Sequence, residues 1–387
     1  MKSNRIKNIS ILKDCYGCGT CSSICPHNII KMVENKNGFY FPKIIEEHKC
    51  TNCGICLSVC SFTSEIKYNN TNLKSYASWS NNPEIRHNAS SGGIGYELAL
   101  QALKEGYKFC GVRYNTNSHR SEHYICNTIE DLKDSLGSKY IPSYTEDAFK
   151  QINFNDKYIV FGTPCQIASL RLLIKKKKKE DNFILVDFFC HGVPSLKMWD
   201  KYISETGIKD KKEINIIKWR DKKTGWHDSW RIVATDKNDK EIYRSKNVNE
   251  DLFYKYFLGH YALSPCCINS CKFKKNNTLA DIRIGDLWGD EYKNEENGVS
   301  GLICYTPKGE DLISNIKNAT FIVHNNEIVT QGQMSNNAKK PRCYKFINCL
   351  LKISSMKLNT ILRTKEYVLL CVDLPKIIFN KLKRVLS

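Results

Sequence analysis

Apolar and polar residues follow two different periods along the middle of the chain. Residues 94–104 repeat apolar side chains at helical spacing, which predicts a helix that buries one face. Residues 158–161 and 183–189 are short apolar runs, typical of buried strands, and a helical pattern that starts near Cys165 lies between them. Because strands alternate with helices here, we predict an α/β domain over residues 76–200.

The segments on either side show other patterns. Residues 29–33 and 38–41 are expected to be short strands around a turn, and the polar, Asn-rich stretch at 68–74 is expected to be a linker. We therefore predict an α+β multi-domain chain. Its domains are expected at residues 1–66, 76–200 and 201–350, followed by a basic, helical tail at 351–387.

The composition is that of a folded protein from a reducing compartment. The chain has 387 residues, and 41% of them are hydrophobic, which is enough for a core beyond a small N-terminal unit. Its 19 cysteines fit free thiols in the cytoplasm better than a secreted disulfide scaffold. The first residues lack the apolar segment of a signal peptide, and no apolar stretch is long enough to span a bilayer. We therefore expect a cytoplasmic protein.

Two cysteine runs repeat one spacing, C-x2-C-x2-C-x3-C, with a glycine at the same place in each run. This is the spacing of bacterial ferredoxins, in which the fourth cysteine of each run binds the other [4Fe–4S] cluster. The predicted ligands are Cys15, Cys18, Cys21 and Cys60 for the first cluster, and Cys50, Cys53, Cys56 and Cys25 for the second. Ser61 stands where a proline is expected after the second run, a departure that leaves the ligands in place. Two zinc knuckles or a disulfide knot are the alternative, although zinc ligands usually occur as two pairs.

The formal net charge is +19. Three interpretations stay open: docking of an acidic electron carrier such as ferredoxin, nucleic-acid binding, or a lysine-rich surface without a specific role. No nucleic-acid-binding module is present, so we expect no nucleic-acid partner. The lysine run at 175–179 is either a solvated helix end or part of a ferredoxin-docking surface. The basic C-terminal tail could contact a membrane peripherally.

Four further segments carry a recognisable ordered set of motifs. They are Gly-Thr-Pro-Cys-Gln at 162–166, Asp-Phe-Phe-Cys-His-Gly at 187–192, Trp-Arg-Asp-Lys-Lys-Thr-Gly-Trp at 219–226, and Cys-Ile-Asn-Ser-Cys at 267–271 followed by Asp-Ile-Arg-Ile-Gly-Asp-Leu-Trp-Gly at 281–289. In this order they resemble the beta subunit of coenzyme F420-reducing hydrogenase and F420-dependent formate dehydrogenase. The resemblance covers residues 76–350 and includes Ser-Ser-Gly-Gly at 90–93 and Gly-Ser-Lys-Tyr at 137–140. It implies a ferredoxin-like domain followed by a larger α/β domain that binds FAD.

Cysteines in this region suggest a third [4Fe–4S] cluster. Cys165 follows Gly-Thr-Pro near a helix N-terminus, where the helix dipole favours a thiolate. Cys190 follows a buried strand, and Cys267 and Cys271 form a loop pair. Together they could supply four thiolates, although Cys266 beside Cys267 leaves open which of the two binds. Buried structural cysteines or a redox-active thiol pair are the alternative.

The flavin site is expected where small residues open a helix, because free backbone N–H groups there suit a pyrophosphate. The residues expected to contact the flavin are Ser90, Ser91, Gly92, Gly93, Gly137, Ser138 and Lys139. Lys139 could neutralise a phosphate or the reduced flavin, and His191 could donate to the flavin or transfer protons. These two are the candidate catalytic residues, and a loop lysine and a structural histidine are their alternatives. Trp219, Trp226 and Trp230 are expected to be core or interface residues.

Two functions compete. The first is a flavin and iron–sulfur oxidoreductase that passes electrons between a ferredoxin-like donor or a reduced deazaflavin such as F420, the clusters and FAD. FAD would then link one-electron to two-electron chemistry. The second is an electron-transfer subunit docked to a separate catalytic partner, with a possible link to exopolysaccharide biosynthesis.

Overall fold

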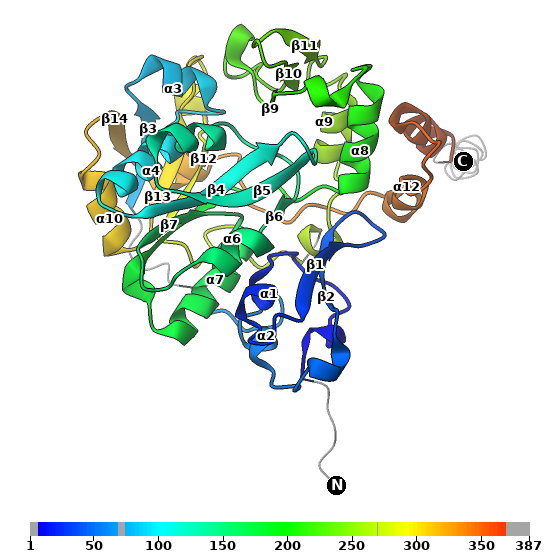
Figure 1. The fold of residues 1–387 in the computed structure, drawn as a ribbon. Coiled ribbons are helices and arrows are strands. Elements are labelled where there is room, and N and C mark those ends of the chain that lie inside the picture. The colour runs from blue at the N-terminus through cyan, green and yellow to red at the C-terminus, as the bar shows by residue number, and fades with distance from the viewer. Residues whose placement is uncertain (1–6, 69–73, 269, 369–387) are drawn as a thin grey trace, which may run out of the picture.

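A mixed sheet forms the centre of the computed structural model, which describes residues 7–68, 74–268 and 270–368 (Figure 1). In sheet order its strands are β14 (Ala319–His324), β3 (Lys74–Ser80), β13 (Ser300–Cys304), β12 (Ile282–Asp286), β8 (Phe183–Phe188), β7 (Tyr158–Phe161), β4 (Lys108–Asn115), β5 (Arg120–Cys126) and β6 (Ser143–Tyr144). The four central strands β12, β8, β7 and β4 are parallel. Strands from both sides of residue 200 share this sheet, so the predicted division at that residue does not separate two sheets.

Helices cover both faces of the central strands. One face packs on α4 (Ile94–Lys104) and α10 (Pro307–Ser314), and the other packs on α6 (Glu146–Gln151) and α7 (Pro164–Lys177). The apolar run of β7 shows why: Ile159 and Phe161 face the first layer, whereas Tyr158 and Val160 face the second. A strand buried on both faces must be apolar throughout, as the sequence pattern predicted.

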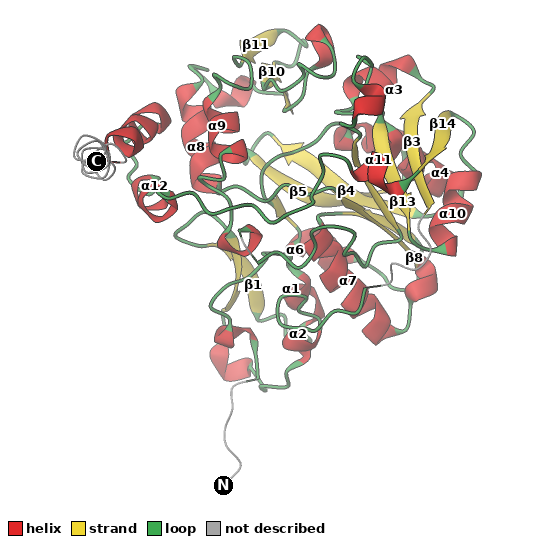
Figure 2. Cartoon of the chain, turned by 180° about the vertical axis from the view of Figure 1, so that it is seen from behind, coloured by secondary structure: helices red, strands yellow, loops and turns green. Residues whose placement is uncertain are grey.

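Residues 195–268 and 344–362 build an aromatic lobe at one end of the sheet (Figure 2). It contains the small antiparallel sheet of β9 (Ile216–Lys218), β10 (Val233–Thr235) and β11 (Glu241–Arg244), and the helices α8 (Leu196–Glu205), α9 (Leu252–Leu258) and α12 (Tyr344–Leu350). Trp199, Trp219 and Phe253 are buried at its centre. Three further helices are short: α3 (Pro83–Asn88), α5 (Ile129–Leu132) and α11 (Asn326–Thr330).

The N-terminal unit lies against α6 and α7, below the sheet in Figure 1. It consists of α1 (Thr20–Ile24), α2 (Ile55–Ser58) and the antiparallel strands β1 (Ile30–Glu34) and β2 (Tyr40–Ile44), close to the predicted strand positions. Thr145 Oγ1 donates to the Cys18 carbonyl at 3.0 Å, and Met32 N donates to Glu146 Oε2 at 2.6 Å. Gly19, with φ at +75°, packs against Thr145, where a side chain would clash. The unit is thus docked by specific hydrogen bonds.

Ser61, which replaces the expected proline, has a structural role at this contact. Its backbone N–H donates to Ser169 Oγ at 3.2 Å, and Ser169 Oγ donates to Ser61 Oγ at 2.7 Å. Ser61 Oγ donates in turn to the Cys165 carbonyl at 3.2 Å. A proline would lack the N–H and the hydroxyl that make these bonds. In the described part of the chain, no helix is long and apolar enough to cross a bilayer.

A buried ion pair joins β8 to β12. The Arg283 guanidinium donates to both carboxylate oxygens of Asp187 at 2.7 Å, and both side chains are 0% exposed. Thr278 Oγ1 also donates to Asp187. Each side chain of the pair therefore neutralises the buried charge of the other.

We predict that Asp187→Ala lowers the free energy of unfolding by about 3–5 kcal/mol, because it leaves the Arg283 charge buried and unpaired. Anaerobic chemical denaturation measures the change. Asp200→Ala is the matched control: Asp200 pairs with Arg120 but its side chain is 43% exposed, so the loss there should stay below about 1 kcal/mol. Equal losses in the two variants would contradict the prediction.

Candidate functional site

Four cysteines of the N-terminal unit line one small cavity. They are Cys25, Cys50, Cys53 and Cys56, and apolar side chains such as Ile29, Ile30 and Ile44 complete the wall. Cys53 is exposed to solvent. Asn8 Nδ2 lies 3.5 Å from Cys50 Sγ, within donor reach of a ligand sulfur. The structure thus brings together the ligands predicted for the second cluster, including Cys25 from the other run.

The ligands predicted for the first cluster lie deeper. Cys18, Cys21 and Cys60 are buried. Burial raises the pKa of Cys21, and Cys18, Cys15 and Cys60 raise it further, because neighbouring thiolates repel one another. The pKa of Cys18 is likewise raised by burial and then by Cys60. These mutual effects place Cys60 with the first run, as the crossed pattern requires.

Cysteines from three separate segments form a third group beside the first. Cys165 opens α7, Cys190 follows β8, and Cys267 ends the short helix Pro265–Cys267. Burial raises the pKa of Cys165, and Cys190 and Cys267 raise it further. Burial also raises the pKa of Cys267, with Cys190 and Cys271 adding to the effect. The four cysteines predicted for a third cluster therefore lie together.

The helix dipole was expected to lower the pKa of Cys165, but burial has the larger effect in this structure. Burial is the largest influence on its thiol, so the pKa rises instead of falling. Thr163 Oγ1, at 3.3 Å from the sulfur, opposes the rise only in part. A buried thiolate here needs a positive partner such as iron.

Cys266 has a hydrogen-bond partner outside the third group. Its Sγ donates to the Cys15 carbonyl at 3.4 Å, and the side chain is buried. Burial raises its pKa to about 11. Of the adjacent pair, Cys267 is the residue whose thiol is coupled to Cys190 and Cys165, so the geometry favours Cys267 as the ligand.

The donor sets fit clusters better than single ions. Among the described residues, no three Cys, His, Asp or Glu side chains converge as the ligands of one metal ion do. Tetrahedral zinc requires every ligand sulfur at about 2.3 Å from one atom, whereas each thiolate of a [4Fe–4S] cube binds a different iron. The described cysteines are also free thiols, which does not fit a disulfide knot.

Tyr16 lies between the first and third groups. It belongs to the Cys15–Cys18 loop, and its ring packs edge-on against Phe62 at 5.2 Å and Phe273 at 5.7 Å. Burial raises its pKa, and Cys165 and Cys271 of the third group raise it further. The three cysteine groups thus form a series that runs from the exposed Cys53 to the loops of the large sheet.

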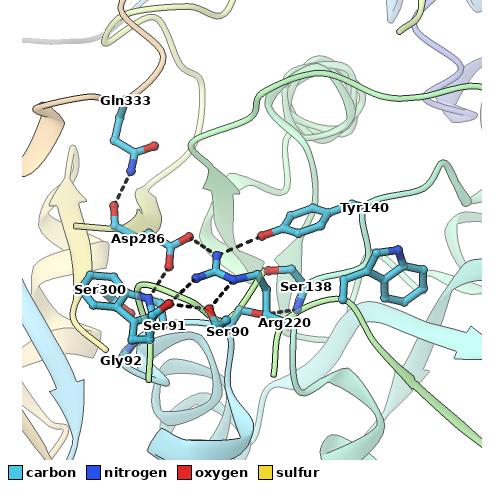
Figure 3. Close-up of polar contacts among 12 residues, drawn as sticks. Ser90, Ser91, Gly92, Ser138, Tyr140, Arg220, Asp286, Ser300 and Gln333 are labelled. Atoms are coloured by element: carbon cyan, nitrogen blue, oxygen red, sulfur yellow. Dashed lines mark hydrogen bonds and ion pairs between the residues drawn. The ribbon is translucent and has the colours of Figure 1, made fainter. Parts of the chain in front are cut away.

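The two loops predicted to hold a flavin do meet (Figure 3). Ser138 N donates to Ser90 Oγ at 2.8 Å, and Gly92 N donates to Ser300 Oγ at 2.9 Å. Ser91 Oγ donates to the Val299 carbonyl at 2.6 Å. Gly93 has a left-handed backbone, with φ at +83°, and caps α4. Much of the hydrogen-bonding capacity expected for a pyrophosphate is therefore used within the protein.

The two candidate catalytic residues lie in different surroundings. Lys139 Nζ donates to the carbonyls of Asp134, Leu136 and Gly137, and burial lowers its pKa to about 7. His191 follows Cys190, and its ring packs at a tilt against that of Phe257, with the ring centres 4.8 Å apart. Burial lowers the His191 pKa to about 4, and His260 and Lys274 lower it further, so the imidazole is neutral at pH 7. That value does not suit proton transfer near neutral pH.

An arginine and aromatic cluster beside the Ser90 loop was not singled out from the sequence. Arg220 lies 4.2 Å from the ring centre of Trp230 and 5.0 Å from that of Trp288. Its Nη1 lies 3.3 Å from Asp286 Oδ2, and Trp226 Nε1 donates to Asp286 Oδ1 at 2.9 Å. The motifs at 219–226 and 281–289 already contained Arg220, Trp226, Asp286 and Trp288. The signal in them was a charged Arg220 and a charged Asp286 among apolar neighbours.

We predict that Cys267→Ala lowers the iron content of the anaerobically reconstituted chain from about twelve to about eight atoms, because a cube that loses a thiolate is not retained. Cys266→Ala is the matched control and should keep about twelve. Iron analysis per chain distinguishes the two. A loss with Cys266→Ala and none with Cys267→Ala would reverse the assignment.

Comparisons with known proteins match most of the chain between residues 14 and 328. The model for the N-terminal part of the coenzyme F420 hydrogenase/dehydrogenase beta subunit matches residues 75–150, and the model for its C-terminal part matches residues 155–328. A 4Fe-4S dicluster domain matches residues 14–64.

Two curated relatives are similar over different lengths. A subunit of the F(420)H(2) dehydrogenase of Methanosarcina mazei is 23% identical over 311 residues, which cover 73% of this chain and 80% of that protein. The coenzyme F420-dependent sulfite reductase of Methanocaldococcus jannaschii is 27% identical over 161 residues, 41% of this chain but only 25% of that protein. The chain therefore spans about a quarter of the length of the sulfite reductase.

Among solved structures, a chain of the F420-reducing [NiFe] hydrogenase complex from Methanosarcina barkeri aligns with a TM-score of 0.46 and 18% identity. The alignment covers 79% of this chain and 95% of that one. The matches to both parts of the beta-subunit model, in the order predicted from the motifs, identify the family. The chain belongs to the family of coenzyme F420 hydrogenase/dehydrogenase beta subunits and carries an N-terminal 4Fe-4S dicluster domain.

Proposed function

We propose that this chain is an electron-transfer subunit that relays single electrons through three [4Fe–4S] clusters between an external redox protein and a catalytic partner. One observation carries the proposal: three cysteine groups lie in series, and the middle group is adjacent to both others. Cys21 of the first group is influenced by Cys56 of the second, and Cys18 of the first group influences Cys165 of the third. Electron transfer between clusters requires such proximity and no substrate pocket.

The second cluster is the terminal that an external protein can reach. Cys53 is exposed, whereas Cys18, Cys21 and Cys60 are buried behind it. A net charge of +19 favours an acidic partner, because opposite charges accelerate encounter. We infer a ferredoxin-like carrier or an acidic partner subunit at this end.

The clusters would supply one-electron chemistry, and the chain's own residues would hold and shield them. The thiolates of the three groups would bind iron, and Asn8 would donate to the Cys50 sulfur. Tyr16, Phe62 and Phe273 exclude water between the first and third groups. Ser61 and Ser169 fix the N-terminal unit against α7, so the spacing of the groups does not depend on the linker.

The catalytic partner is inferred from the family. The curated relatives are named as part of a dehydrogenase and as a sulfite reductase, both with F420 in their names. We infer a partner of the same kind, with a reduced deazaflavin or its electron acceptor as the ultimate substrate. The number of free thiols fits a cytoplasmic location. A link to exopolysaccharide biosynthesis remains a prediction from the resemblance.

A flavin oxidoreductase is the second candidate, and the Arg220 cluster favours it. Tyr140 and Arg220 lie next to the Ser90–Ser138 contact (Figure 3). Arg220 lies over the rings of Trp230 and Trp288, and Trp230 stacks on Tyr140, so aromatic rings gather beside this contact. FAD bound there would link one-electron to two-electron chemistry. The internally bonded Ser90, Ser91 and Gly92, however, fit a pyrophosphate poorly, and the proposed relay requires no flavin.

We predict that Cys53→Ala removes only the second cluster, because the exposed Cys53 contributes little to the core. The iron content should fall from about twelve to about eight atoms. Reduction of the remaining clusters by a reduced ferredoxin should slow at least about tenfold, which corresponds to about 1.4 kcal/mol in the barrier. Stopped-flow absorbance under anaerobic conditions measures the rate.

The control for that experiment is reduction by dithionite, a small reductant that does not need the docking terminal. Its rate should change little in Cys53→Ala. An unchanged rate with ferredoxin would show that electrons enter elsewhere and would refute the proposed order.

The flavin content separates the two candidate functions. If the chain is a flavoenzyme, denaturing the anaerobic, FAD-loaded protein should release about one yellow, fluorescent chromophore per chain, and Trp230→Ala should reduce that amount. Release of no flavin from the wild-type chain would exclude the flavoenzyme and leave the relay. The absorbance and fluorescence of the supernatant are the measurements.

A further inference from the structure

A short segment, residues 271–274, connects the third cysteine group to its surroundings through two lysines. Lys274 is 8% exposed, and its Nζ donates to the carbonyls of Cys190 at 2.7 Å and His191 at 3.1 Å. Lys272 Nζ donates to the carbonyls of Ser61, Phe62 and Ser64, just beyond Cys60. Two ammonium groups are therefore held close to the proposed ligands.

The contacts of Lys274 do not neutralise its charge. Backbone carbonyls accept its hydrogen bonds but carry no net charge. The nearby carboxylate of Asp187 is already paired with Arg283. A buried ammonium is costly unless an anion lies close to it. Four thiolates around an iron–sulfur cube supply such an anion, since one of them belongs to Cys190 itself.

The two lysines lie beside different cysteine groups and differ in burial. Lys274 is buried and donates to the carbonyl of Cys190, a proposed ligand of the third cluster. Lys272 donates to the carbonyls just beyond Cys60 of the first group, and its side chain is only half-buried, so water screens its charge more strongly. The third site therefore has the less screened of the two positive charges.

We propose that Lys274 holds the third [4Fe–4S] cluster at a higher reduction potential than the two ferredoxin-type clusters, so that electrons collect there. The inference rests on the proposed three-cluster relay and gives it a direction. Reduction adds one electron to the cluster, and a nearby cation stabilises the more negative state. In the step itself a cluster of the N-terminal unit is oxidised and the third cluster is reduced by the same electron, and no bond forms or breaks.

An anaerobic redox titration of the full-length, reconstituted chain tests the proposal. The midpoint potential of each cluster is followed by electron paramagnetic resonance. In Lys274→Gln the midpoint of the third cluster should shift to lower potential, while the midpoints of the other two stay in place. Lys274→Arg, which keeps the charge, should restore most of the wild-type value.

Lys275→Gln is the matched control. Lys275 is adjacent in sequence and carries the same charge, but its side chain is exposed, so water and salt screen it. Its removal should leave the three midpoints unchanged. An equal shift in Lys274→Gln and Lys275→Gln would overturn the proposal, because net charge alone would then account for it.

Three further outcomes also decide the question. An unchanged third midpoint in Lys274→Gln, with about twelve irons still bound, would overturn this inference and leave the relay standing. Loss of the third cluster from both Lys274→Gln and Lys274→Met would overturn it too, because the lysine would then be a structural support. About eight irons in the wild-type chain would instead refute the three-cluster relay itself.

Discussion

Thiols packed against one another in the interior set the constraint on which the rest of this structure depends. Burial and neighbouring sulfurs both raise the pKa of Cys21 in the first group and of Cys165 and Cys267 in the third. Thiolates so placed cannot persist without positive charge nearby. Iron bound at these groups would provide that charge, and loading of the clusters would then be coupled to folding of the loops around them.

The same requirement, that the cysteine groups stay close together, explains why the N-terminal unit is held to the large domain by hydrogen bonds. The contact depends on directed hydrogen bonds, from Thr145 to the Cys18 carbonyl, between Ser61 and Ser169, and from Lys272 to the carbonyls beyond Cys60. Apolar packing alone would tolerate sliding, whereas hydrogen bonds fix position to a fraction of an ångström. Fixed positions matter for a relay because electron transfer depends steeply on distance.

The strand order of the large sheet brings distant segments of the chain to one edge. Cys165 follows β7, Cys190 follows β8, and Asp286 ends β12, and these three strands are parallel neighbours. The carboxyl ends of neighbouring parallel strands meet at one edge of a sheet, which is where α/β proteins usually place their sites. Segments more than a hundred residues apart thereby reach one site, and the Arg220 cluster lies beside the same edge.

The sequence by itself determined the features that depend on short spacings. The cysteine runs indicated both ferredoxin-type ligand sets because a cube is wrapped by a local loop, and the apolar runs indicated β7 and β8 because a strand buried on both faces must be apolar throughout. Only the tertiary structure distinguished the contacts of Cys266 from those of Cys267, gave Ser61 its docking role, and placed strands from both sides of residue 200 in one sheet. It also showed that Ser90 and Gly92 bond within the protein, and that Lys274 lies against the Cys190 carbonyl. These outcomes depend on contacts between residues far apart in the chain. Packing and the direction of each side chain set such contacts, so they leave no short-range pattern in the sequence.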